Sequence, residues 1–228
     1  MGEEPTKPRK KRQRKTPLTR EAVLSAAMRL ADREGVDALS MRKLARALRV
    51  EAMSLYNHVA NKDDLLDGLV DRVIGEIELP TLGGDWREAM RRRALSAHDV
   101  LMRHPWATLL ILSRVNTGPA MLRYIDATLG CLREAGFSWA LADYAWNTLD
   151  GHVYGFTLQR LTFPFEPKEY AAKAAEYAPM VPADTYPYMR GLTLEVAEGR
   201  HDGVQELELG LGLLLEGFER LRVEGWTR

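Results

Sequence analysis

Two short helical segments separated by only two residues constrain this chain more than any other feature. Residues 41–48 and 51–58 each place apolar side chains on one helical face. Helices this short are marginal alone, so they need a longer helix against which to bury these faces. The segments at 19–35, capped by Thr19, and 61–78, capped by Asn61, can supply it. The arrangement predicts a helix-turn-helix, a unit whose second helix enters the major groove of DNA.

The remainder of the chain also has helical periodicity and no convincing strand pattern, which predicts an all-α fold. Further long helices are expected over 85–104, 119–136, 138–160 and 203–223. Residues 162–187 hold five of the eleven prolines and should form a loop with a short Ala-rich helix near 168–177. We therefore expect a basic arm (1–17), a three-helix DNA-binding domain (18–64) and a larger helical domain (65–228), with the helix at 61–78 linking the two domains.

The net charge of zero conceals an asymmetry. Residues 1–20 carry eight Lys and Arg against two Glu, so the rest of the chain has a net charge of −6. A basic, proline-containing arm before a helix-turn-helix suggests a disordered segment that contacts nucleic acid, although a solubilising tail has the same composition. There is no long apolar run and no signal-peptide pattern, and Cys131 has no partner within the chain. A cytoplasmic, nucleoid-associated protein with Cys131 in its core is expected.

The run GVDALSMRKLARALRVEAMSLYNHVANKDDLL over residues 35–66 resembles the TetR family of transcriptional regulators. The pair Leu55-Tyr56, then His58 and Asn61-Lys62, is similar to that family's strongest signature. Looser similarity at 136–138 and at Gly151-His152 indicates the tetracycline-repressor branch. The family usually has glycine in the tight turn where this chain has Arg49. A left-handed backbone there costs a non-glycine residue about 1 kcal/mol.

The resemblance implies DNA contacts from three groups of residues. The second helix, the recognition helix and the start of the fourth helix would supply Met41, Arg42, Lys43, Ala52, Met53, Ser54, Tyr56, Asn57, His58 and Lys62. Cations would hold phosphates, while Ala52 and Met53 would reach thymine methyl groups. The alternatives are a solvated face for Arg42 and Lys43, partial core packing for Tyr56 and a structural role for His58.

A helix-turn-helix that reads a palindromic operator normally works as a two-fold dimer. The helices at 138–160 and 203–223 are apolar on two sides, and a homodimer through a four-helix seam is also what the family resemblance implies. A small-molecule inducer would bind between the middle helices, in a pocket lined by Trp106, Leu110, Arg114, Asn116, Trp146, Asn147, His152, Tyr154 and Phe156.

Comparison with the tetracycline repressor argues against a magnesium-tetracycline complex. Its metal-binding histidine aligns at or beside Ile111, and its glutamate aligns with Arg160. Isoleucine cannot ligate a metal and arginine repels one, so no metal and no cofactor are expected. We interpret the sequence as a ligand-responsive regulator, more often a repressor than an activator. An architectural DNA-binding protein is the alternative, and an enzyme is the remotest, because Asp150 and His152 do not face each other on a helix.

Overall fold

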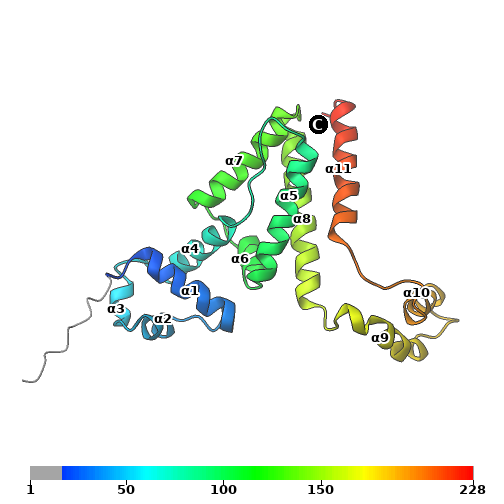
Figure 1. Ribbon diagram of the computed structural model, residues 1–228, viewed down its shortest axis with the longest axis horizontal. Coiled ribbons are helices and arrows are strands. Elements are labelled where there is room, and N and C mark those ends of the chain that lie inside the picture. The colour runs from blue at the N-terminus through cyan, green and yellow to red at the C-terminus, as the bar shows by residue number, and fades with distance from the viewer. Residues whose placement is uncertain (1–16, 228) are drawn as a thin grey trace, which may run out of the picture. The chain divides into compact units, whose positions relative to one another are not determined.

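The computed structural model describes residues 17–227, and the basic arm predicted at 1–17 lies, apart from Pro17, outside that range. All its regular elements are helices, as the sequence predicts (Figure 1). The chain divides into two compact units, residues 1–65 and 66–228. In chain order the helices are α1 (Arg20–Glu34), α2 (Met41–Leu48), α3 (Ala52–Leu55), α4 (Lys62–Ile74), α5 (Trp86–Arg103), α6 (Ala107–Ser113), α7 (Pro119–Glu134), α8 (Trp139–Thr162), α9 (Tyr170–Tyr177), α10 (Pro187–Ala197) and α11 (Leu207–Val223), with short 3₁₀ turns at Pro167–Glu169 and Ala178–Met180.

The first unit is built around α1, whose buried face includes Val23, Ala27 and Ala31. Thr19 begins the helix by accepting a hydrogen bond from the Ala22 amide, and Gly35 ends it with a positive φ of 79°. The apolar faces of α2 and α3 contribute Leu44 and Leu55, both fully buried. The long helix thus provides the support that the two short helices require.

The second unit has α8 at its centre, in contact with α5, α7 and α11. This explains why the α8 sequence is apolar on more than one face. Trp86 at the start of α5 meets Phe137 edge-on, with ring centroids 4.7 Å apart, which ties α5 to the turn between α7 and α8. Cys131 is buried in this core, and burial raises the pKa of its thiol.

Several helices differ from the sequence expectations. We did not predict α6 or α10, because prolines near each were interpreted as loop signals. Pro187 instead occupies the first turn of α10, where its missing N–H is tolerated. The α-helical bonding of α3 stops at Leu55, and the segment continues to His58 through a bond from the His58 amide to the Leu55 carbonyl (2.9 Å). Such tightened turns are common at helix ends.

Two further boundaries move inward. Helix α4 ends at Ile74 rather than 78, because bonds of the i→i+3 type replace the helical pattern around Gly75. Helix α11 begins at Leu207 rather than 203, after Gly203 with a φ of 73°. Between α8 and α11, α9 and α10 pack on each other.

Candidate functional site

The turn between α2 and α3 has the tight geometry of a helix-turn-helix. Ser40 caps α2 by accepting a hydrogen bond from the Lys43 amide (3.3 Å). Arg49 ends the helix in the left-handed region, with φ 57° and ψ 44°, and it is the one non-glycine residue of positive φ in the described chain. The Val50 amide bonds back to the Ala45 carbonyl (3.0 Å), which completes a Schellman-type end. The left-handed position expected at Arg49 is therefore present.

The predicted DNA-binding side chains lie on the solvent side of this unit. Met53 is 74% exposed and Tyr56 is 44% exposed, whereas Leu55 between them is fully buried. Of the other predicted residues, four are also exposed, namely Arg42, Lys43, Asn57 and Lys62. The remaining four are half-buried, namely Met41, Ala52, Ser54 and His58. The Lys43 ammonium group also pairs with Glu34 on α1 (3.2 Å). The recognition segment thus offers one outward face with hydroxyl, amide and apolar groups.

Two residues that the sequence analysis did not select contribute to this site. Arg46 is exposed one turn after Arg42 on α2, an i,i+4 spacing that would have revealed it. Arg20 donates to the His58 carbonyl (2.8 Å) and forms a two-bond ion pair with Asp64 (2.6 and 2.9 Å). Asp64 also accepts from the Ala60 amide (2.7 Å). Arg20 therefore fixes the end of the recognition segment to the start of α4, a contact between residues far apart in sequence.

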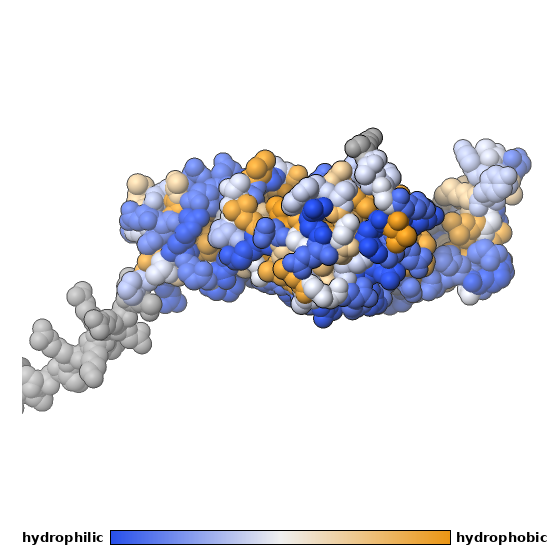
Figure 2. Space-filling model, turned by 90° about the horizontal axis from the view of Figure 1, so that it is seen from above, coloured by the Kyte–Doolittle hydropathy of each residue, from blue (hydrophilic) through white to orange (hydrophobic). Residues whose placement is uncertain are grey.

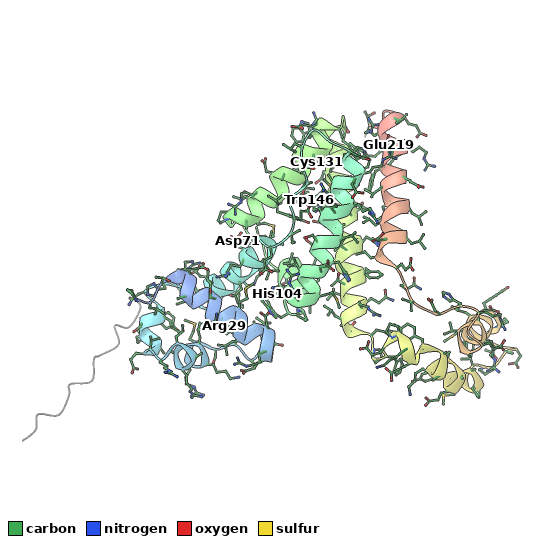
Figure 3. The ribbon with its side chains drawn as sticks, viewed as in Figure 1. Arg29, Asp71, His104, Cys131, Trp146 and Glu219 are labelled. Carbon is green, nitrogen blue, oxygen red and sulfur yellow. The ribbon has the colours of Figure 1, made fainter. Side chains whose placement is uncertain are left out.

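A second polar group of side chains lies inside the second unit, contributed by α5, α7 and α8. The Asp150 carboxylate accepts from Arg93 Nη1 (2.7 Å) and Tyr124 Oη (3.0 Å) on one oxygen. Its other oxygen accepts from Trp146 Nε1 (2.8 Å) and lies 3.5 Å from Tyr154 Oη. We call these five residues the Arg93 cluster; Trp146, on α8, is labelled in Figure 3.

The Arg93 cluster is strongly shielded from solvent. Arg93 is fully buried, and its side chain also lies over the Tyr124 ring, 5.1 Å from the centroid. Burial alone would lower the pKa of Arg93, but Tyr124 and Asp150 outweigh it and the pKa is raised. Burial raises the pKa values of Tyr124 and Tyr154. The guanidinium therefore stays charged and both phenols stay protonated at neutral pH.

The structure separates the nine predicted ligand residues into several groups. Trp146 and Tyr154 join the Arg93 cluster. The Phe156 ring packs against the His98 ring. Nε2 of His152 lies 3.3 Å from the Leu207 carbonyl oxygen. Asn147 is exposed and donates a hydrogen bond within α8. Trp106 and Leu110 lie at the start of α6 and within it. The sequence pattern does not indicate that Arg93, Tyr124 and Asp150 form a site, because polar residues on an amphipathic helix are normally solvated.

The two remaining predicted residues, Arg114 and Asn116, contact α4. Arg114 pairs with the Asp67 carboxylate (2.8 Å), and the Asn116 amide donates to the Asp67 carbonyl (2.9 Å). One turn later Asp71 accepts from the amides of Ala120 and Met121 (2.9 Å each), which caps α7 (Figure 3). Asp67 and Asp71 therefore tie the second half of α4 to the segment that leads into α7.

A cavity of about 460 Å³ lies in the region of α9 and α10, away from the predicted pocket. Its lining is mostly aromatic and apolar and includes Phe165, Tyr170, Tyr177 and Met189. Figure 2 shows hydrophobic surface at this end of the second unit. One of the nine predicted ligand residues, Phe156, lines a neighbouring hollow. That hollow and the cavity share the lining residues Phe163 and Tyr170.

The two positions aligned with the metal-binding residues of the tetracycline repressor lie on different helices. Ile111 is buried on α6 and Arg160 is exposed on α8. Within residues 17–227, no three side chains of His, Cys, Asp or Glu gather closely enough to hold a metal ion. Nor is any helix in that range long and apolar enough to cross a membrane.

Both units of the chain match family models of known proteins. Residues 23–69 match the model of bacterial regulatory proteins of the tetR family, and residues 79–222 match the tetracyclin repressor-like C-terminal domain. An HTH-type transcriptional regulator of Saccharopolyspora erythraea is 40% identical over 65% of this chain and 64% of its own. The class D tetracycline repressor of Escherichia coli is 31% identical over 89% of each chain.

A solved structure is similar over nearly the full length. The complex of ActR from Streptomyces coelicolor with actinorhodin has a TM-score of 0.76 and 29% identity, covering 90% of this chain and 98% of that one. The family match extends over more than half of the sequence and includes both the helix-turn-helix and the helical body. This chain belongs to the TetR family of bacterial transcriptional regulators.

Proposed function

We propose that this protein is a one-component repressor in the bacterial cytoplasm. Its first unit binds a palindromic double-stranded DNA operator as half of a homodimer, and a small molecule bound in the second unit releases it. The observation that carries the proposal is the outward face of the recognition segment, where Met53 and Tyr56 are exposed beside the buried Leu55. That face lies within the stretch matched to the tetR family.

Exposed faces on α8 and α11 support dimer formation. On α11, Leu209 is 67% exposed and Leu213 is 65% exposed, and these leucines lie one turn apart on one side of the helix. On α8, Gly151 and Gly155 are exposed with open space beside them. Small residues allow a helix of a second copy to approach closely, which would offset their poor helix propensity. A seam of two helices from each protomer would remove this apolar surface from water.

The Arg93 cluster is our candidate for the inducer site. It lies in the domain matched to the tetracyclin repressor-like C-terminal family and contains two of the predicted ligand residues, Trp146 and Tyr154. The ActR structure with actinorhodin supports a small molecule in this class of fold. The aligned residues Ile111 and Arg160 argue against a magnesium-dependent ligand.

Helix α4 is the element through which the ligand would act. Its second half is tied to the entrance of α7 by Asp67 and Asp71, and its first residue is Lys62, a predicted phosphate contact. A ligand that shifts α6 or α7 would move α4 and change the separation of the two recognition segments in the dimer. The operator would then bind the unliganded conformation more tightly, and the inducer would stabilise the conformation that does not fit the operator.

The test is a gel-shift titration with DNA from around the protein's own gene. We expect Tyr56→Ala to weaken operator binding by about tenfold to a hundredfold, the cost of about 1–3 kcal/mol for a lost base or phosphate contact. Tyr188→Ala, at a tyrosine on α10 that is 92% exposed, is the matched control and should bind as the wild type. Equal affinities for the two variants would refute the predicted recognition face.

The second arm of the test separates a repressor from an architectural protein. Release from a footprinted palindrome by a small molecule supports the regulator, whereas an architectural protein would show binding that no ligand changes. Deletion of residues 1–15 checks the basic arm, because removal of phosphate contacts should flatten the salt dependence of binding.

A further inference from the structure

The hydrogen bonds of the Arg93 cluster are unequally distributed. Asp150 is surrounded by donors, since Arg93, Tyr124, Trp146 and Tyr154 all point a proton-bearing atom at it. On the cationic side, Nη1 of Arg93 contacts both Asp150 and the Tyr124 hydroxyl. Nε and Nη2 of the same guanidinium are buried, and neither finds an acceptor among residues 17–227. The cluster therefore has more donors than acceptors.

This imbalance lies on one edge of the guanidinium. Nε–H and the adjacent Nη2–H point the same way and form a planar fork that matches the two oxygens of a carboxylate. A buried donor without an acceptor is costly, and arginine is rarely fully buried even when, as here, it is paired with a carboxylate. The two donors therefore indicate an oxygen-bearing partner that binds at this edge.

Arg93 is flanked by apolar residues on α5 and by aromatic residues on α8. Met90 and Ala97 precede and follow Arg93 by about one turn on the same face of α5, and both are buried. Trp146, Asp150 and Tyr154 follow one another at i, i+4 and i+8 on α8. The Asp150 side chain retains 11% exposure and Trp146 is half-buried, so the cluster is not completely sealed on the α8 side.

We infer that the inducer of this protein carries a carboxylate on a planar apolar body, and that both carboxylate oxygens accept hydrogen bonds from Nε and Nη2 of Arg93. This inference rests on the proposed function, because it assigns a ligand class to the same sensor site. Asp150 contacts Nη1, on the other edge of the guanidinium, and holds the group in place, while Tyr124 and Trp146 donate hydrogen bonds to the Asp150 carboxylate. Arg93 is the residue that touches the ligand.

The experiment compares acids with their neutral counterparts on the full-length protein. The probes are benzoate, 1-naphthoate and anthraquinone-2-carboxylate, each paired with its primary amide, which has the same shape without the charge. Binding is followed at pH 7 and constant ionic strength by tryptophan fluorescence, since Trp146 belongs to the cluster, and by release of the operator fragment. We expect at least one acid to bind about tenfold or more tightly than its amide, as a charge-assisted pair of bonds requires.

The variants assign that preference to the fork. Arg93→Met should reduce the ratio of acid affinity to amide affinity to about one. Arg93→Lys, which keeps the charge without the fork, should retain only part of the wild-type ratio. Arg93→Met leaves Asp150 buried and unpaired, so the double variant Arg93→Met/Asp150→Asn repeats the measurement in a neutral cluster. Arg92→Met is the matched control, because Arg92 is the next residue on α5, is exposed and pairs with Glu78. It should preserve the preference of the wild type.

Three outcomes overturn the inference. The first is that no acid in the panel binds more tightly than its amide. The second is that the acid preference survives in both Arg93→Met variants. The third is a crystal structure at saturating acid that shows only a water molecule at Nε and Nη2. If a neutral compound releases the operator and the acids do not, the protein is still a ligand-responsive regulator, but its inducer is not a carboxylate. If no DNA fragment is bound, the proposed function as a DNA-binding regulator is refuted, while the ratio of acid affinity to amide affinity still tests the role of Arg93.

Discussion

The two units of this chain use their polar side chains in opposite ways. In the first unit the side chains assigned to DNA stand at the surface, over apolar residues such as Leu44 and Leu55. In the second unit the most distinctive polar group, the Arg93 cluster, lies inside the protein and its arginine is inaccessible to solvent. A surface that must meet a large, hydrated polyanion can remain solvated until contact, whereas selection of a small molecule requires fixed, desolvated groups. Substitutions on the exposed face of the first unit should therefore affect mainly DNA binding, whereas substitutions in the Arg93 cluster should also affect stability.

The largest effect is expected from Asp150→Ala. This substitution leaves the Arg93 cation buried without its carboxylate, and breaking a buried pair typically costs about 3–5 kcal/mol. All five tryptophans lie after residue 65, so fluorescence during urea unfolding reports on the second unit. Asp143→Ala is the control on α8, where an exposed carboxylate accepts a hydrogen bond from Asn147 of its own helix, and it should change stability by less than about 0.5 kcal/mol. Similar midpoints for the two variants would contradict the importance of the buried pair.

A smaller effect is expected where α4 meets α7. A methyl group at Gly118 would overlap the Asp71 carboxylate, which then could not cap α7 at the amides of Ala120 and Met121. We expect Gly118→Ala to lower stability by about 1–2 kcal/mol, the usual cost of a lost cap, and to weaken the coupling between ligand and operator. Gly84→Ala, at a position with open space, is the control. Unchanged inducer response in Gly118→Ala would remove α4 from the proposed mechanism.

Arg49→Gly tests the first unit, and here we expect stability and binding to change in opposite directions. The left-handed backbone at this position costs arginine about 1 kcal/mol, so glycine should slow hydrogen exchange in α2. The same change removes an exposed cation beside the recognition segment and should weaken operator binding severalfold and reduce its salt dependence. Arg29→Gly, within an ordinary stretch of α1, should destabilise instead. Destabilisation by Arg49→Gly would show that the arginine side chain stabilises the turn.

The contrast between the units also explains what the sequence could predict. The all-α fold and the capped helices around the helix-turn-helix follow from local rules that act within about ten residues, such as the Ser40 cap, whereas the left-handed position at Arg49 was expected from the family resemblance. The Arg93 cluster follows from no local rule. It joins Arg93, Tyr124 and Asp150 from three helices, and a lone arginine in an amphipathic helix has the same pattern whether it faces water or a core. Arg114 and Asn116 were selected as ligand anchors for their polarity, but their contacts with α4 depend on tertiary packing.

The smallest effect is a difference in acid sensitivity between the units. Arg20 lowers the pKa of Asp64 in the first unit, through its side-chain hydrogen bonds, and Arg222 lowers the pKa of Glu219 in the second to about 2. A carboxyl whose folded pKa is depressed stabilises the protein above its unfolded value, about 4, and this contribution is lost as the pH falls through the folded pKa. The second unit should therefore lose stability between about pH 5 and pH 2, and the first unit should lose it as the pH falls below the unfolded value of Asp64, each through its own ion pair.

Local probes can separate the two contributions. Trp86 donates to Glu219 (3.2 Å), so tryptophan fluorescence follows the second unit, while exchange of the His58 and Val59 amides follows the first. In Asp64→Asn the exchange of those amides should be faster at pH 7 and should respond less to acid, because the ionised form of the pair with Arg20 is already absent. The fluorescence transition should remain as in the wild type. If Asp64→Asn shifted the fluorescence transition as well, the two units would share one acid transition and would not depend on separate ion pairs.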